Sequence, residues 1–435
     1  MALTMLRFRT MGAASAALIL GCAAKTPEPA TAANDSVSAP ATAGAAQAAG
    51  APASARTPAA DAPREAAAPK PEPVAVESRL ALPGSARATF TDATRAFSEG
   101  RLADAKTAFE KAGAAAPANA APRVGAGAVL EREGDAPGAV GLYRRAAALE
   151  PADPEAARAL VLGLIAIRET AEAMAFARHR AEKFAKSPAA ATLHSEAASA
   201  AGDSATAQAE AQRALALDSS YVPAMLAVAR DHYRAGRVSM TDYALRALLD
   251  GIDESTPARA QDCAEALLLR AIIDRRVPGG RTRALDGFAK VHALRPDLTE
   301  AALALGVMKL EAGNAADAIV PLEVAARFAP KNAFVMTALG DAYRLAGRYA
   351  EAKTTLEKAL SVEGSLAAPH YNLALLFLYA GDKLGVGNEE RYASAKREME
   401  AYLGLRGPKA PPGVDDDADS LLSAATRKLA EVTAK

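Results

Sequence analysis

The sequence predicts an all-α protein, namely an α-solenoid of about eight or nine helix–turn–helix units. Alanine is the commonest residue, whereas aromatic residues make up only 5% and tryptophan is absent, a composition that favours closely packed helices over sheets. Prolines recur at a constant interval, at Pro83, Pro117 and Pro151 and again at Pro296 and Pro330. The period is about 34 residues, and a helical unit of this length cannot bury its apolar face alone, so the repeat predicts that successive units stack on one another.

Between these prolines, small and large residues follow one pattern. Small residues are expected where the two helices of a unit cross, a glycine in the turn between them, and a proline where the second helix ends. The copies with identical spacing are Gly306, Gly313, Ala318, Leu322, Ala325 and Pro330; Gly340, Gly347, Ala352, Leu356, Ala359 and Gly364; Gly127, Gly134, Ala139, Tyr143, Ala146 and Pro151; and Ala93, Gly100, Ala105, Phe109, Ala112 and Pro117. The pattern resembles the tetratricopeptide repeat over roughly three quarters of the chain. This resemblance implies a right-handed solenoid in which the first helix of each unit lines a groove that binds other proteins.

The repeat divides the segment 83–406 into units. Those that fit the pattern are 86–119, 120–153, 188–221, 299–332 and 333–366, and 154–187 fits loosely because Ala185 takes the proline position. The interval from Ser219 to Pro296 is nine positions longer than two repeats, so we expect an inserted or lengthened helix in the units near 222–261 and 262–298. A ninth unit, 367–406, contains about six or seven extra residues in its turn.

The N-terminus has the features of an export signal. Residues 1–21 combine Arg7 and Arg9 with the apolar stretch Met11–Leu20, which is too short to span a bilayer. Gly21-Cys22 ends a stretch that resembles the lipobox of bacterial lipoproteins, in which the cysteine is acylated; the alternative is an ordinary signal peptide with a chance cysteine. The resemblance, together with the non-acidic residue after Cys22, implies a lipid anchor in the outer membrane, with the protein on the periplasmic face.

The segments on either side of the repeats are predicted to be linkers. Residues 22–82 are rich in Ala, Pro, Thr and Ser, which predicts a disordered tether between the anchor and the folded part. The tail 407–435 begins with a Pro-rich linker and continues with a helix that caps the last unit. The acidic run Asp415–Asp419 suits the N-terminus of that helix, because acidic groups complement its dipole.

The residues that catalysis or metal binding requires are scattered. Lys+Arg and Asp+Glu balance at 51 each, which argues against nucleic acid as a partner because phosphate binding needs surplus basic side chains. The five histidines lack metal-ligand spacing, Cys263 is expected to be a buried helix residue without a disulfide partner, and the sequence contains neither a phosphate-binding loop nor a GxSxG motif. We therefore predict no enzyme activity, cofactor, metal or small-molecule substrate.

Two acidic segments leave alternatives open. The run Asp415–Asp419 lacks the alternating ligands and central glycine of a calcium loop. The segment 382–390 contains two glycines, three acidic residues and an asparagine, so it is a plain turn, a turn that contacts a partner, or a cation site.

The tetratricopeptide resemblance places candidate binding residues along the groove. Arg and Tyr are common at binding hot spots, and exposed aromatic side chains give apolar contact area. The candidates are Phe90, Phe97, Arg230, Tyr233, Arg234, Asp341, Arg344, Tyr371 and Tyr379. Capture of a C-terminal carboxylate, which some family members achieve with repeated Lys and Asn, is not expected because only Asn372 is at such a position.

These features predict a membrane-anchored, non-enzymatic scaffold. Its groove would bind envelope proteins and help to assemble a gliding-motility complex, a pilus or secretin, or outer-membrane proteins. An alternative is an adaptor that brings peptidoglycan-remodelling enzymes to the outer membrane. A third hypothesis, an enzyme with its active site in the groove or in 222–298, has no catalytic constellation to support it.

Overall fold

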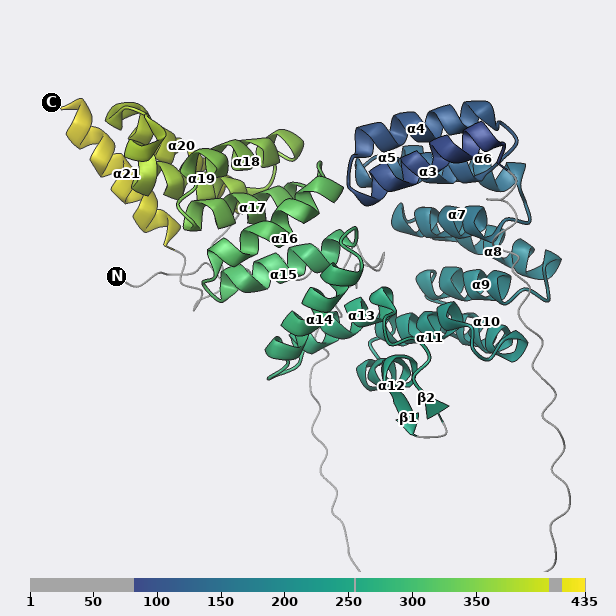
Figure 1. Ribbon diagram of the computed structural model, residues 1–435. Helices are drawn as coiled ribbons and strands as arrows, with labels where there is room; N and C mark the ends of the chain where they lie inside the picture. The colour runs from purple at the N-terminus through teal and green to yellow at the C-terminus, as the bar shows by residue number, and fades with distance from the viewer. Residues whose placement is uncertain (1–81, 254–255, 407–416, 435) are drawn as a thin grey trace, which may run out of the picture. The chain divides into compact units, whose positions relative to one another are not determined.

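The computed structural model describes residues 82–253, 256–406 and 417–434. The predicted signal 1–21, Cys22, the rest of the tether up to residue 81 and the linker 407–416 lie outside the described residues. Between Gly84 and Arg406 the chain forms nine consecutive helix pairs (Figure 1). The prediction of an all-α solenoid of stacked helix pairs is confirmed.

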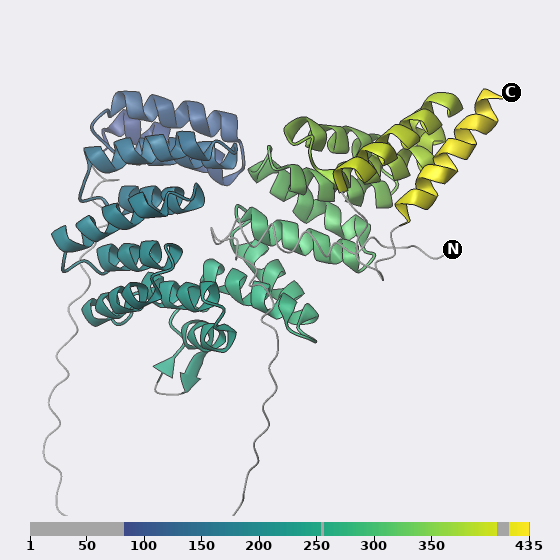
Figure 2. The same ribbon diagram turned by 180° about the vertical axis from the view of Figure 1, so that it is seen from behind.

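In each pair an antiparallel second helix packs against the first, and it also contacts the first helix of the next pair. Figure 2 shows the same succession from behind. The pairs are α3 (Gly84–Ser98) with α4 (Leu102–Ala115), α5 (Ala121–Arg132) with α6 (Ala136–Leu149), α7 (Pro154–Ala166) with α8 (Thr170–Lys183), α9 (Pro188–Ala200) with α10 (Ser204–Leu217), α11 (Val222–Arg234) with α12 (Val238–Leu249), α13 (Ala264–Arg276) with α14 (Arg281–Leu294), α15 (Thr299–Glu311) with α16 (Ala315–Phe328), α17 (Ala333–Leu345) with α18 (Tyr349–Val362), and α19 (Ala367–Ala380) with α20 (Asn388–Arg406).

The small residues of the sequence pattern lie where the helices of a pair cross. Gly340 of α17 faces Leu356 of α18, and a Cβ atom added at Gly340 would lie 2.6 Å from the Leu356 Cγ. Gly306 faces Leu322 in the same way in the preceding pair. Leu322 and Leu356 are fully buried. The absent side chain lets the two helices approach closely, and the large residue opposite fills the space between them.

Local sequence features determine where the helices begin and end. The Asp153 carboxylate accepts hydrogen bonds from the backbone N–H of Glu155 and Ala156 and so caps α7. Residues in the left-handed backbone conformation follow the ends of the first helices. Seven of these residues are glycines, at positions 100, 134, 202, 236, 279, 313 and 347. In the third pair the same position is occupied by Arg168, with φ of 66°. A non-glycine residue is strained in this conformation, which is consistent with the loose match of 154–187 to the repeat.

The extra residues between Ser219 and Pro296 form a β-hairpin. Strands β1 (Gly251–Asp253) and β2 (Thr256–Pro257) pair antiparallel directly after α12. Helices α11 to α14 keep the length of the others, so the expected inserted or lengthened helix is wrong. Gly251, with φ of +80°, ends α12, and a proline follows within the hairpin. Both favour a turn over another helical segment.

The last pair differs from the others in its turn and in what covers it. The extra residues predicted there form the short 3₁₀ helix η1 (Gly381–Leu384) and a left-handed Gly385. Helix α21 (Ala418–Thr433) then packs against α20 and buries Leu421 and Ala425. In the described part of the chain, no helix has the length and apolar character needed to cross a bilayer.

Replacing Arg168 by glycine should stabilise the third pair, because glycine removes the strain of a left-handed arginine. We expect Arg168→Gly to raise the free energy of unfolding by about 1 kcal/mol, measured by urea unfolding and by hydrogen exchange of α7 and α8. The matched control is Gly202→Ala, where φ is +85° and an added Cβ meets no atom within 4 Å. It should lower the free energy of unfolding by a similar amount, and equal effects of the two changes in the same direction would contradict the strain at Arg168.

Candidate partner-binding groove

The first helices of the first five pairs lie next to one another, and so do those of the last three pairs. Contacts join α3 with α5, α5 with α7, α7 with α9, α9 with α11, α15 with α17 and α17 with α19. We call the surface formed by the first helices α3, α5, α7, α9, α11, α13, α15, α17 and α19 the groove face. Residues one repeat apart occupy the same position on adjacent units of this face, so side chains from neighbouring units can be combined into one site.

An apolar cavity opens in the groove face at the first three pairs. Its volume is about 140 Å³, and cavities of this size hold an apolar ligand as large as benzene. The lining residues are Phe90, Phe97, Phe109, Ala121, Val124, Gly125, Ala128, Asp153 and Glu155. We call it the phenylalanine cavity.

Three rings form the apolar wall of the phenylalanine cavity. The Phe90 and Phe109 centroids are 5.5 Å apart with an edge-to-face geometry, which is favourable for aromatic pairs. The guanidinium of Arg132 lies 6.0 Å from the Phe97 centroid. Phe90 and Phe97 are half-buried, so both remain available for contact with a partner. The structure therefore places the first two predicted groove residues in the wall of one cavity.

The predicted residues Arg230 and Arg234 of α11 bind a buried carboxylate. Glu196 of α9 is 4% exposed, and its Oε1 lies 2.8 Å from Arg230 Nη1 while its Oε2 lies 3.2 Å from Arg234 Nη1. Burial acts to raise the pKa of Glu196, but the charges and hydrogen bonds of the two guanidinium groups outweigh it and hold that pKa below its ordinary value. Glu196 is therefore ionised at neutral pH.

Tyr233 lies beside this ion pair. The guanidinium of Arg276, from α13, is 5.6 Å from the centroid of the Tyr233 ring, a cation–π contact. Burial raises the pKa of Tyr233. We call Glu196, Arg230, Tyr233, Arg234 and Arg276 the basic cluster. It combines residues of three first helices, α9, α11 and α13, and the contact of Arg276 with Tyr233 connects α13 to α11.

The remaining predicted residues lie in the last two pairs, and only one of them, Tyr379, has an exposed side chain. Asp341 is buried and accepts a 2.6 Å hydrogen bond from Arg344 Nη2; burial raises the pKa of Asp341 although Arg344 opposes this. Tyr371 is also buried, and its hydroxyl donates a 2.8 Å hydrogen bond to Asp417 at the start of α21. Tyr379, in contrast, is 66% exposed. The tail thus covers the groove face at Tyr371.

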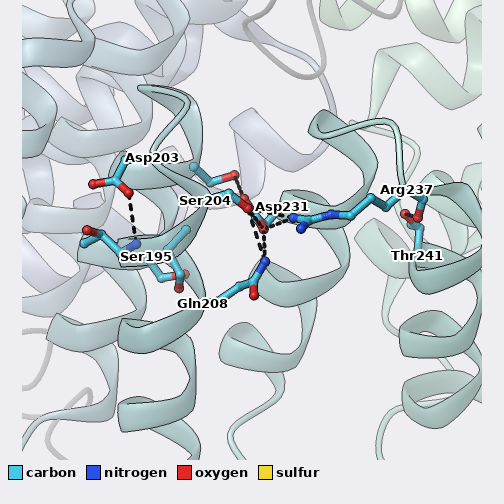
Figure 3. A network of polar contacts seen from close by, with 10 residues as sticks. Ser195, Asp203, Ser204, Gln208, Asp231, Arg237 and Thr241 are labelled. Carbon is cyan, nitrogen blue, oxygen red and sulfur yellow. Dashed lines mark hydrogen bonds and ion pairs between the residues drawn. The ribbon is translucent and has the colours of Figure 1, made fainter.

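A second buried carboxylate, Asp231, connects three helices and the start of a fourth (Figure 3). It accepts hydrogen bonds from Ser199 (3.0 Å), Ser204 (2.7 Å) and Gln208 (3.2 Å), and from Arg237 Nη2 at 2.7 Å. Burial acts to raise the pKa of Asp231, but these hydrogen bonds and the Arg237 charge keep it below its ordinary value. Both carboxylate oxygens are satisfied, so the network stabilises the fourth and fifth pairs.

The described residues contain no group of three His, Cys, Asp or Glu side chains that could hold a metal ion. Within 382–390, Lys383 lies 5.2 Å from the ring of Tyr349, so this turn packs on the preceding pair. Cys263 is half-buried at the start of α13, and burial raises the pKa of its thiol. A thiol with a raised pKa is a poor nucleophile at neutral pH.

Sequence reasoning did not identify Glu196, Arg276 or the other residues around Phe90. The repeat spacing in the sequence gives a signal for two of these residues, Glu196 and Val124. Glu196 precedes Arg230 by one repeat, and Phe90 precedes Val124 by one repeat, so each pair occupies one position on adjacent units. Complementary residues at the repeat spacing would have indicated both sites. Phe109 comes from the second helix of its pair, where a large apolar residue is expected only to pack in the core.

Comparisons with known proteins concern the fold. No protein-family model and no curated protein matches the sequence. Among solved structures, the APC/C hetero-tetramer Cut9–Hcn1 has 14% identity and a TM-score of 0.47, over 74% of this chain and 59% of that chain. MamA from Desulfovibrio magneticus RS-1 has 19% identity and a TM-score of 0.34, over 42% of this chain and 94% of that one. A tetratricopeptide repeat protein from Parabacteroides merdae has 12% sequence identity to this chain and a TM-score of 0.31. The match covers 79% of this chain and 100% of that chain.

The Asp231 network predicts a defined pH dependence of stability. Because the folded pKa of Asp231 is lowered, its contribution is complete above the unfolded pKa of about 3.9 and is lost as the pH falls through the folded pKa. Asp231→Asn should reduce the free energy of unfolding by about 1–3 kcal/mol at neutral pH. Below about pH 4 the variant should lose less stability than the parent.

Urea unfolding at a series of pH values tests this expectation. Asp242→Asn is the matched control, because Asp242 is an exposed residue of α12 in the same pair. An Asp231→Asn curve parallel to the parent curve down to low pH would contradict the assigned role of the carboxylate.

Proposed function

We propose that this protein is a non-enzymatic scaffold whose groove face binds a segment of another protein. The observation that carries the proposal is the phenylalanine cavity, which exposes aromatic surface on the first helices of the array. Half-buried aromatic side chains around a pocket are typical anchors for a partner's apolar side chain. The stacked pairs hold these helices in fixed positions, so the cavity is formed before a partner binds.

We further propose that the scaffold is attached to the outer membrane through Cys22, with the repeats on the periplasmic face. The support comes from the sequence of the signal 1–21, which ends in Gly21-Cys22, and from the Pro-rich segment that follows. Acyl chains bind a bilayer by burying methylene groups, at about 0.8 kcal/mol each. A tether behind such an anchor would let the repeats reach partners of an envelope assembly, such as a gliding-motility, pilus, secretin or outer-membrane assembly complex.

Substitution of Phe97 tests the binding role. Phe97→Ala should remove apolar contact area from the cavity wall and weaken capture of the partner by about 2 kcal/mol, the size of a hot-spot loss. The measurement is quantitative mass spectrometry of proteins that co-purify with the tagged full chain from gently solubilised membranes. Val320→Ala is the control, because Val320 is 64% exposed on α16 and outside the groove face. Equal recovery of every partner with both variants would exclude the cavity as the binding site.

Substitution of Cys22 tests the anchor independently. Cys22→Ser should move the protein from the membrane to the soluble fraction, because no other segment is expected to bind the bilayer. Sedimentation of membranes gives the partition, and mass spectrometry of the mature N-terminus gives the acylation. A parent protein without acyl groups, or a Cys22→Ser protein that still sediments with membranes, would contradict this part of the proposal.

A further inference from the structure

The basic cluster contains more positive than negative charge. Two guanidinium groups, those of Arg230 and Arg234, share the single carboxylate of Glu196. A third, that of Arg276, lies over the Tyr233 ring and forms no ion pair with an acidic residue in the described part of the chain. Its neighbour Arg275, in contrast, pairs with Glu311 at 3.0 Å. The arginines of the cluster are therefore incompletely neutralised.

Nearby acidic groups do not remove this surplus. Glu265 of α13 contributes to the electrostatic field at Arg230. However, Glu265 is also shared with Arg295, whose Nη1 lies 3.4 Å from it. The Arg234 side chain is only 9% exposed, and its buried Nε has no hydrogen-bond partner among the described residues. A buried guanidinium that lacks both a full counter-charge and a partner for Nε is unfavourable unless a ligand supplies them.

The geometry of the cluster suits a carboxylate ligand. Guanidinium groups bind carboxylates through planar, paired hydrogen bonds, and such bonds are about twice as strong as neutral ones. Arg276 is exposed and Arg230 is partly exposed, so both can be reached from solvent. Glu196 already shows that this site accepts a carboxylate between two arginines. A second carboxylate would neutralise one of the two remaining positive charges.

We propose that the basic cluster binds an Asp or Glu side chain of the partner, so that the segment held on the groove face is acidic. This inference rests on the proposed function, and it adds the chemistry of the partner. A protein carboxylate fits better than a nucleic acid, because the whole chain has zero net charge and the surplus is confined to a few side chains. Glu196 acts as an internal competitor for the same guanidinium groups.

Short labelled peptides of equal length test the charge preference directly. The peptides differ only at alternate positions, which are Glu in one, Gln in the second and Lys in the third. Binding to the full chain is measured by fluorescence anisotropy at several salt concentrations. We expect the Glu peptide to bind at least about tenfold more tightly than the Gln peptide, with an affinity that falls as salt rises. Equal affinities, or a preference for Lys, would overturn the proposal.

Two substitutions with opposite expected effects locate the site. Arg276→Gln should lower the affinity for the Glu peptide about tenfold. It should leave folding intact, because Arg276 is exposed. Glu196→Gln removes the internal competitor and should raise the affinity for the same peptide. Circular dichroism establishes that each variant is folded. The matched control is Arg144→Gln, which removes one exposed positive charge from α6. A loss with Arg144→Gln equal to that with Arg276→Gln would show that net charge, not the cluster, determines binding.

The outcome is distinguishable from a failure of the proposed scaffold function. If Phe97→Ala abolishes capture of cellular partners while Arg276→Gln has no effect on any peptide, the acidic-segment inference fails and the scaffold function stands. If the Glu peptide binds at the cluster, Arg276→Gln should also reduce recovery of the cellular partner.

Discussion

The close approach of two helices within each pair is the constraint on which the rest of the structure depends. It requires a small residue on the first helix and a large apolar residue on the second, as in Gly340 with Leu356 and Gly127 with Tyr143. A Cβ atom at either glycine would meet the opposing side chain at a distance that real contacts do not reach. Because the requirement recurs in successive repeats, the pairs have similar crossing geometry and each new pair packs on the last in the same way.

The groove face follows from this regularity. When successive first helices are equivalent, residues one repeat apart become neighbours on one surface, and a site can be assembled from units distant in sequence. Phe90 and Val124 meet in this way in the phenylalanine cavity, and Glu196 and Arg230 meet in the basic cluster. The same geometry fixes these side chains relative to one another, because each projects from a helix that packs against its neighbours.

Sequence predicted the features that local rules determine and missed those that depend on distant contacts. The helix pairs and their turns follow from residue size and backbone freedom, so they were predictable. The arginine at position 168 shows that packing can force a residue into a strained turn, and Gly251 shows that a surplus of residues need not form a helix. Tyr371 is covered by Asp417 of the tail, which no local pattern specifies. No local feature marks Glu196 in the sequence, because only the fold brings Arg230 and Arg234 of the next unit to it.

The two sites of the groove face differ in how they would contribute to binding. Apolar contact in the phenylalanine cavity removes surface from water and so contributes mainly affinity. Charged groups in the basic cluster interact over a longer range and reject a partner of the wrong sign, so they contribute orientation and specificity more than affinity. The internal pairing of Glu196 strengthens this division, because a ligand carboxylate gains only what it adds beyond the existing ion pair. A partner that presents both an apolar side chain and an acidic one would therefore be selected over a segment that presents either alone.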